Sequence, residues 1–246
     1  MFRYYITSLV LLSVIIITWN ISEFWGIFAF LTEDFRNIFN STLMTFSISF
    51  VSALLLLAVS IFFSWLIYRY PSWEKILRAV VCISVIPSVL ALIVLKNVFG
   101  VFPGAKTWNF SVIVFVLAFL NLIFLFVFTR LNRQLQEEFT KPYHAMTAQL
   151  AKISVFKSSF GKIMVIVRES FKSMMILTFS ATVFLEARLS GDELYKGIYS
   201  YFFQGFGDTH VSRKLAILLF ILFFLMVVMG LYSLAWRLFY KHYSEN

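Results

Sequence analysis

The side chains best suited to chemistry in this sequence lie along one hydrophobic stretch that ends in a carboxylate. Thr178, Thr182 and Glu186 follow one another at intervals of four residues, which places them on one stripe of a helix, with Ser180 between them. Polar groups inside a membrane must face protein or a water-filled path. Two interpretations are therefore open: the stripe lines a route for a polar solute, or it makes ordinary hydrogen bonds between helices.

Other polar residues also lie inside or beside apolar stretches. Asn121 is near the middle of one such stretch, where interhelical hydrogen bonding and lining of the route are again the alternatives. Arg168, Glu169 and Lys172 fall in the first turns of the stretch that leads to Glu186. Either the two cations extend to the lipid headgroups while Glu169 caps or pairs, or the three residues line an inner gate.

No motif predicts an enzyme or a bound cofactor. His144, His210 and His242 are far apart in the sequence, so a shared metal site is not expected. The single Cys82 lies in an apolar run and permits no disulfide framework. No glycine-rich loop ends in Lys-Ser or Lys-Thr, so the chain is not expected to bind ATP in the Walker fashion. We therefore expect any energy source to lie on another protein.

The composition is that of a membrane protein. The 246 residues are 61% hydrophobic and 13% charged, whereas soluble domains are about 45–50% apolar and about 25% charged. Several apolar runs approach the roughly 20 residues that a helix needs to cross a bilayer. The sequence predicts one all-α transmembrane domain over 1–246, with an interfacial helix over 23–40 and six spans at about 4–21, 43–68, 79–95, 110–129, 163–185 and 215–234.

Three patterns predict how these helices pack. The interfacial helix carries one apolar face, made of Ile27, Leu31, Phe35 and Ile38. The second span is rich in small polar residues that favour close helix contact, namely Ser47, Ser49, Ser52, Ser60 and Ser64. The segment 130–161, interrupted at Pro142, has apolar residues spaced for one face, namely Leu131, Leu135, Phe139, Met146, Leu150 and Ile153.

The distribution of charge predicts the orientation of the chain. Lys and Arg are about twice as frequent on one side of the six spans, and such residues accumulate in the cytoplasm, so both termini are predicted to be cytoplasmic. This explains the net charge of +9 without a nucleic-acid partner. The basic inner segment at about 141–162 is longer than a turn requires, which predicts that it docks another molecule.

Four segments resemble a known family. They are Ser41-Thr42-Leu43 with the span that ends at Trp65–Arg69, the proline-containing run Ile83–Val89, Asn121-Leu122, and Phe184-Leu185-Glu186. Over about 41–234 the chain resembles the transmembrane subunits of bacterial type I ATP-binding-cassette importers, in particular the short permeases of the molybdate, sulfate, ferric-iron and thiamine group.

The resemblance implies a multi-pass permease of the bacterial cytoplasmic (inner) membrane that works with several partners. ATP and Mg²⁺ would bind to cytoplasmic ATPase subunits and not to this chain. A second permease subunit would complete the path as a homodimer or heterodimer, and a periplasmic or surface substrate-binding protein would deliver the solute. Membrane lipid surrounds such a subunit, and nucleic acid is not among its partners.

In that family an inner loop forms a short coupling helix that inserts into a groove on the ATPase. The resemblance places this helix within Thr147–Ser154, where the family's characteristic Glu and Gly are absent. The coupling residues that it implies are Ala148, Leu150, Lys152, Ser154, Phe156, Lys157, Phe160 and Gly161. The residues expected on the translocation path are Asn121, Thr178, Ser180, Thr182 and Glu186.

Two other functions are compatible with the sequence. A secondary transporter or channel driven by an ion gradient would be expected to carry carboxylates at the membrane centre or paired broken helices. The predicted spans contain only Pro87 as a breaker and no acid near a midpoint. A membrane scaffold that transports nothing is the second alternative, because the coupling motif is altered. The transported solute is not predicted.

Overall fold

The protein is all-helical in the part of the chain that its structure describes. The structure is a computed structural model that describes residues 2–19, 24–76, 79, 90, 113–114, 122–150, 155–189, 197–199 and 211–244. The principal helices are α1 (Phe2–Trp19), α2 (Phe24–Glu33), α3 (Phe35–Arg69), the short 3₁₀ helix η2 (Pro71–Trp73), α7 (Leu122–Phe139), α8 (Pro142–Leu150), α9 (Val155–Leu189) and α11 (Val211–Ser244). The expected helical class is confirmed.

By length and composition, two of the described helices could cross a membrane. They are Phe35–Arg69, which is α3, and Lys214–Leu238, which lies within α11. They correspond to the second and sixth predicted spans. Most of the third predicted span, 79–95, and half of the fourth, 110–129, lie outside the described residues.

Prolines set several of the helix ends. α3 contains no proline or glycine over its 35 residues and stops just before Tyr70-Pro71. α7 ends at Phe139, and Pro142 opens α8, a position where its fixed φ suits a helix and its missing N–H costs nothing. The break predicted at Pro142 is confirmed.

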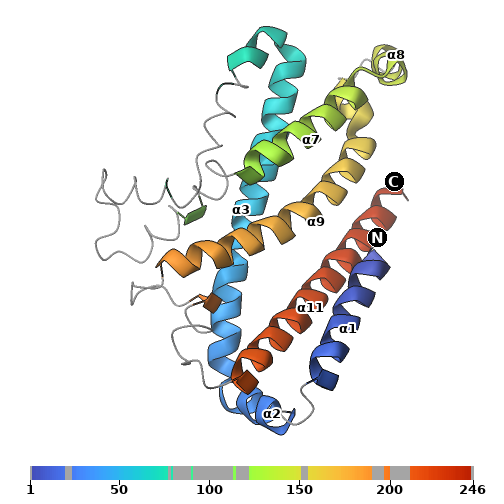
Figure 1. Cartoon of the computed structure of the whole chain (residues 1–246). Coiled ribbons are helices and arrows are strands. Elements are labelled where there is room, and N and C mark those ends of the chain that lie inside the picture. The colour runs from blue at the N-terminus through green and yellow to red at the C-terminus, as the bar shows by residue number, and fades with distance from the viewer. Residues whose placement is uncertain are drawn as a thin grey trace. The chain divides into compact units, whose positions relative to one another are not determined.

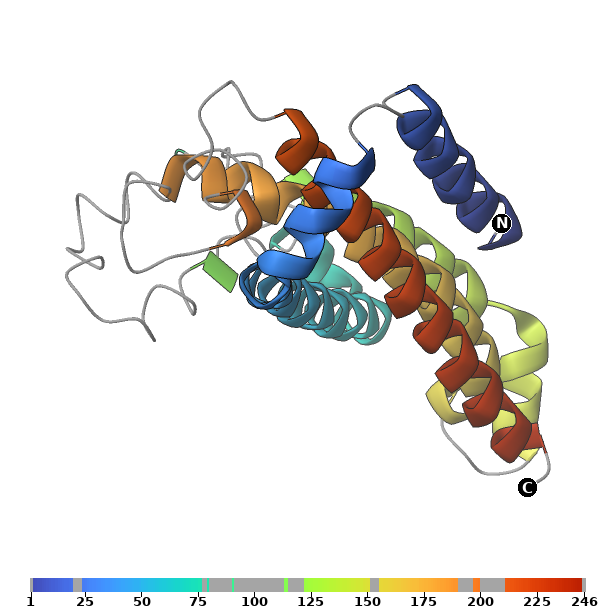
Figure 2. The same ribbon diagram turned by 90° about the horizontal axis from the view of Figure 1, so that it is seen from below.

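The chain forms two compact units. One contains residues 1–42 and 198–246, and the other contains residues 43–197. In the first unit α2 packs against α11, and α1 also contacts α11 (Figures 1 and 2). Phenylalanines hold the start of α3 to α11 there, because the Phe35 ring meets Phe220 edge to face with centroids 5.7 Å apart.

In the second unit α7 lies along α9, and α8 packs on α9 as well (Figure 1). α3 contacts both long helices. It meets α7 where the Gln136 amide donates to the Ser64 carbonyl at 2.6 Å and where the Tyr68 and Phe139 rings lie 5.0 Å apart. It meets α9 where Phe50 and Phe171 pack edge to face. α3 therefore touches both helices through a few side chains, whereas the most extensive contact in this unit is that between α7 and α9.

The predicted packing faces are partly confirmed. Leu131, Leu135 and Phe139 are all buried on one face of α7. Of the five serines in the second predicted span, Ser49, Ser52, Ser60 and Ser64 are fully buried and Ser47 is half-buried.

Two packing predictions are wrong. Met146 and Leu150 do not continue the buried face of α7, because the break at Thr140 and Lys141 turns α8 so that both are exposed; Ile153 lies outside the described residues. The apolar face predicted over 23–40 is divided between two helices, since Asp34 separates α2 from α3. Ile27 and Ile38 are buried, whereas Phe35 is half exposed and Leu31 is only half-buried.

The fifth predicted span is also longer than expected. The sequence suggested a helix over 163–185, but α9 runs from Val155 to Leu189 without interruption. Nothing between Val155 and Ile163 breaks a helix, and Gly161 is accommodated within it. The last residues of the predicted coupling segment are therefore the first turns of α9.

The burial pattern gives a matched stability test. Replacing the fully buried Leu135 with Ala should lower the free energy of unfolding by about 2–5 kcal/mol, because it removes buried methyl groups and leaves a cavity in the contact between helices. The same change at Leu150, which is 78% exposed, should have little effect on the isolated chain. Chemical denaturation in detergent, followed by circular dichroism, measures both, and equal losses would contradict this packing.

Candidate functional site

The polar residues predicted to share a stripe meet a second set of hydroxyls on α3. We call this contact the polar seam; it consists of Thr45 and Ser49 of α3 and Thr178, Thr182 and Glu186 of α9. The Thr45 hydroxyl donates to Glu186 Oε1 at 2.5 Å, and the Ser49 hydroxyl donates to Thr182 Oγ1 at 2.8 Å. All five residues are buried.

The two threonine hydroxyls of the polar seam each donate to a carbonyl one turn earlier in α9. When Ser49 donates to Thr182, the Thr182 hydroxyl donates to the Thr178 carbonyl at 2.7 Å. Thr178 in turn donates to the Met174 carbonyl at 2.8 Å. Such bonds offset the cost of burying polar groups, so the seam fixes the register of α9 along α3.

Glu186 is the acidic member of the polar seam. It is only 1% exposed, and the backbone of Gly197 lies directly against its carboxylate. A Cβ atom at position 197 would overlap with that carboxylate. The Thr45 hydroxyl of α3 and the backbone of Gly197 thus both lie against the Glu186 carboxylate.

The remaining residues expected on the path lie elsewhere. Ser180 is exposed on another face of α9, where its hydroxyl donates to the Ile176 carbonyl at 3.0 Å. Asn121 lies outside the described residues. The structure therefore brings together three of the five. It adds Ser49, which the sequence marked only as one of the small polar residues of the second span, and Thr45, which the sequence analysis did not single out.

A second site joins the end of α7 to α8, and we call it the elbow. The Glu138 carboxylate, at the end of α7, is buried, and it accepts hydrogen bonds from the Lys141 ammonium and, at 2.7 Å, from His144 Nε2. His144 is also buried, and its Nδ1 has no hydrogen-bond partner among the described residues. Sequence reasoning missed this site. The available signal was an acid a few residues before a helix that opens with Pro142, with Lys141 just ahead of that helix and His144 in its first turn.

Electrostatics favours the charged form of Glu138. Burial alone would raise the pKa of this carboxyl, but the hydrogen bonds from Lys141 and His144 and the charges of those two residues outweigh burial and hold the pKa below its usual value. Because an ionised carboxylate only accepts, His144 Nε2 carries a hydrogen in this pair. The elbow is thus a contact between charged groups that joins the end of α7 to α8.

α8 presents an apolar face to the outside. Tyr143, Met146 and Leu150 are 72%, 65% and 78% exposed, and their spacing of three and four residues places them on one side of the helix. The opposite side is buried through His144 and Ala148. A helix held rigidly on one side and apolar on the other is suited to enter a groove on another protein.

The predicted coupling residues are distributed over three regions. Leu150 is exposed on α8, whereas Ala148 is buried behind it. Phe156, Lys157, Phe160 and Gly161 belong to the first turns of α9, where Phe160 is half-buried and Gly161 is exposed. Lys152 and Ser154 lie outside the described residues. Tyr143 and Met146 were not among the residues expected to dock.

Comparisons of the chain with protein-family models, with curated proteins and with solved structures found no match. Within the described ranges, no group of three His, Cys, Asp or Glu side chains could hold a metal ion. The polar seam and the exposed face of α8 are therefore the features of this chain that bear on its function.

The contact between Gly197 and Glu186 can be tested by a double-mutant cycle. Gly197→Ala should destabilise the protein by about 1–3 kcal/mol, because the new methyl group displaces the carboxylate. In a Glu186→Ala background the same change should lower the stability much less, because the carboxylate that the new methyl group would meet is absent. Thermal denaturation of the four proteins measures the coupling. Gly161→Ala on α9 is the control, because its Cβ meets nothing within 4 Å; strictly additive effects would contradict the contact.

The elbow predicts a dependence of stability on pH. Because the folded-state pKa of Glu138 lies below its unfolded value, its contribution is complete above that unfolded value, about 4.5, and is lost as the pH falls through the lowered folded pKa. Unfolding free energies between pH 6 and pH 3 should therefore fall more steeply for the wild type than for Glu138→Gln. The control is Glu137→Gln, which alters an exposed acid paired with Arg133 at 2.9 Å; a wild-type slope equal to that of Glu138→Gln would refute this assignment.

Proposed function

We propose that the chain is the transmembrane permease subunit of an ATP-driven importer and that α8 is the helix by which a separate cytoplasmic ATPase grips it. The observation that carries this proposal is the exposed apolar face of α8, formed by Tyr143, Met146 and Leu150 and backed by the elbow. The resemblance of the sequence to short importer permeases adds the class of partner. In this proposal the six predicted spans cross the bacterial inner membrane, with both termini in the cytoplasm.

Exposing three large apolar side chains on one short helix is unfavourable in water. Burying them in a partner would gain roughly 1.5–3 kcal/mol for each side chain that becomes fully buried. The three residues lie at the first, fourth and eighth positions of one helical face, which matches the anchors of a helix that binds in a hydrophobic groove. This argument favours a protein partner for α8.

The length of α9 supports a mechanical role. A helix of 35 residues rises about 52 Å, whereas the hydrocarbon core is about 30 Å thick. The first turns of α9, which contain Lys157 and Lys162, would therefore project into the cytoplasm beside α8. A displacement of α8 by the ATPase would move α9 as a rigid body and would reach the polar seam at its other end.

Transport requires partners that this chain does not contain. Two ATPase subunits would bind ATP and Mg²⁺, a second permease subunit would form the other wall of the path, and a substrate-binding protein would deliver the solute. Thr178, Thr182 and Glu186 would lie beside that path and change partners as it opens. Because the family's Glu and Gly are absent from the coupling segment, we propose that this subunit is the altered member of a heterodimer.

Docking through α8 can be tested with charged substitutions. Met146→Glu and Leu150→Glu should each abolish co-purification of an ATPase from the native membrane, because a carboxylate placed in an apolar groove loses its hydration. Their unfolding free energies should stay within about 0.5 kcal/mol of the wild type, since both positions are exposed. Quantitative mass spectrometry of the purified complex measures the partner.

The matched control is Trp73→Glu, which changes an exposed aromatic residue of η2. It should leave the ATPase bound. If the wild type carries no ATPase, or moves solute into vesicles alone under an ion gradient, the importer proposal is wrong. If all three variants lose the ATPase equally, α8 is not the specific contact.

A further inference from the structure

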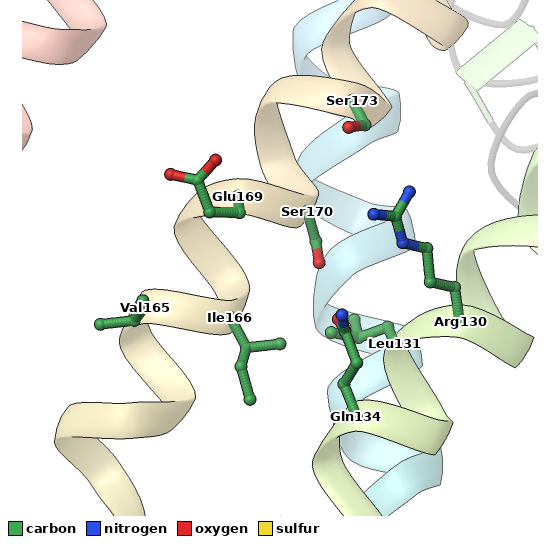
Figure 3. A pocket seen from close by; sticks show the side chains of 8 residues that line it. All are labelled: Arg130, Leu131, Gln134, Val165, Ile166, Glu169, Ser170 and Ser173. Carbon is green, nitrogen blue, oxygen red and sulfur yellow. The ribbon is translucent and has the colours of Figure 1, made fainter. Parts of the chain in front are cut away.

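A cavity lies between α7 and α9 in the second unit, apart from the polar seam and from the exposed face of α8 (Figure 3). Its volume is about 190 Å³. One part of its lining is apolar and the rest is polar, and the eight residues are Arg130, Leu131, Gln134, Val165, Ile166, Glu169, Ser170 and Ser173.

Four of the polar side chains have donors without a partner. Within the described part of the chain, the side chains of Arg130, Gln134, Ser170 and Ser173 make no hydrogen bond or ion pair. Further along α9, Thr178, Ser180 and Thr182 each donate to a carbonyl one turn earlier in the same helix, whereas Ser170 and Ser173 make no such bond among the described residues. The donors around the cavity are therefore free for a ligand that accepts hydrogen bonds.

The charges around the cavity favour an anion. Glu169 is the single acid in its lining, and its carboxylate is directed away from Arg130 (Figure 3). That carboxylate accepts a hydrogen bond from Lys172 at 3.0 Å and lies 3.8 Å from Arg168. The single acid, Glu169, is thus outnumbered by three cations, Arg130, Arg168 and Lys172. The Arg130 guanidinium extends into the space between α7 and α9 (Figure 3).

We propose that this cavity binds the phosphate of an anionic phospholipid from the cytoplasmic leaflet. A planar guanidinium can hold two phosphate oxygens at once, and the two serine hydroxyls and the Gln134 amide supply further donors. The proposal rests on the membrane orientation in the proposed function, which places the end of the fourth span and the start of the fifth at the inner headgroups.

The apolar part of the lining favours a lipid over free phosphate. Val165 is 38% exposed and Ile166 lies beside it, so the cavity offers apolar surface next to the phosphate donors. An inorganic ion would leave this surface in contact with water, whereas the glycerol and upper acyl carbons of a lipid would cover it. Basic pockets between helices on the cytoplasmic side are suited to such headgroups.

The test uses the full chain in nanodiscs of phosphatidylethanolamine and phosphatidylglycerol at a ratio of about three to one, chosen because anionic lipid is then the minor component. Native mass spectrometry after transfer to detergent measures the phosphatidylglycerol that each protein retains. Arg130→Gln should weaken that retention about tenfold or more, since one charge-assisted contact is lost. Ser170→Ala combined with Ser173→Ala should weaken it several-fold, and Arg130→Lys should keep part of it.

The matched control is Arg133→Gln. Arg133 lies on the same helix and is exposed like Arg130, but it is paired with Glu137 and is not part of the cavity lining. It should retain as much phosphatidylglycerol as the wild type. If Arg133→Gln and Arg130→Gln lose lipid equally, or if neither does, the pocket is not a lipid site.

Two further outcomes separate this proposal from the importer function. If inorganic phosphate without lipid protects the wild type from thermal unfolding as well as phosphatidylglycerol does, the ligand is a soluble anion and the lipid assignment is overturned. A wild type that inserts and binds its ATPase but retains no phosphatidylglycerol refutes the pocket alone. A chain that does not insert refutes both.

Discussion

A carboxylate buried between helices must find hydrogen-bond donors, and the second unit is arranged around that requirement. Glu186 accepts from Thr45 on α3, although 141 positions separate the two residues in the chain. This bond sets where α9 crosses α3, and the Ser49 to Thr182 bond one turn away holds the same register. Removing a donor from such a pair leaves a buried polar group unpaired, which costs more than the bond itself contributes.

α3 can set this register because it is long and uninterrupted. Its hydroxyl residues meet α9 through the polar seam, and further along the same helix the Ser64 carbonyl and Tyr68 meet α7. α7 and α9 also pack directly along each other, the cavity lies between them, and α8 packs on α9. The elbow then fixes α8 to the end of α7 by a buried charge and not by apolar packing alone.

The sequence predicted the features that depend on local patterns. Apolar runs indicated helices, the spacing of Leu131, Leu135 and Phe139 indicated a buried face, and Pro142 indicated a break. The buried face of α8 was predicted wrongly, because a break changes the direction of the next helix by an amount that residue spacing does not contain. Met146 and Leu150 are consequently exposed.

Pairings between distant segments were likewise beyond the reach of local patterns. Thr178, Thr182 and Glu186 could be placed on one stripe by counting residues, but their partners on α3 could not, because many serines and threonines lie along that helix. The need for a glycine at position 197 is evident only in the structure, where its backbone lies against the Glu186 carboxylate. The start of α9 was misjudged for a related reason: with no breaker after Val155, helix propensity and packing on α8 extend it beyond the apolar run.

The chemistry of the polar seam also determines how it could open. Ser49 and Thr182 each have a carbonyl of their own helix within 2.7 Å, so either hydroxyl can leave the other and remain hydrogen-bonded. Glu186 Oε1 is the acceptor in its bond from Thr45, and a backbone carbonyl, which is also an acceptor, cannot replace that donor. If an ATPase moves α9 through α8, the hydroxyl pair should therefore separate first, while the bond between Thr45 and Glu186 acts as the pivot. We expect this order because Ser49 and Thr182 each keep a hydrogen-bond acceptor in their own helix when the helices separate, whereas Glu186 Oε1 would lose the Thr45 donor.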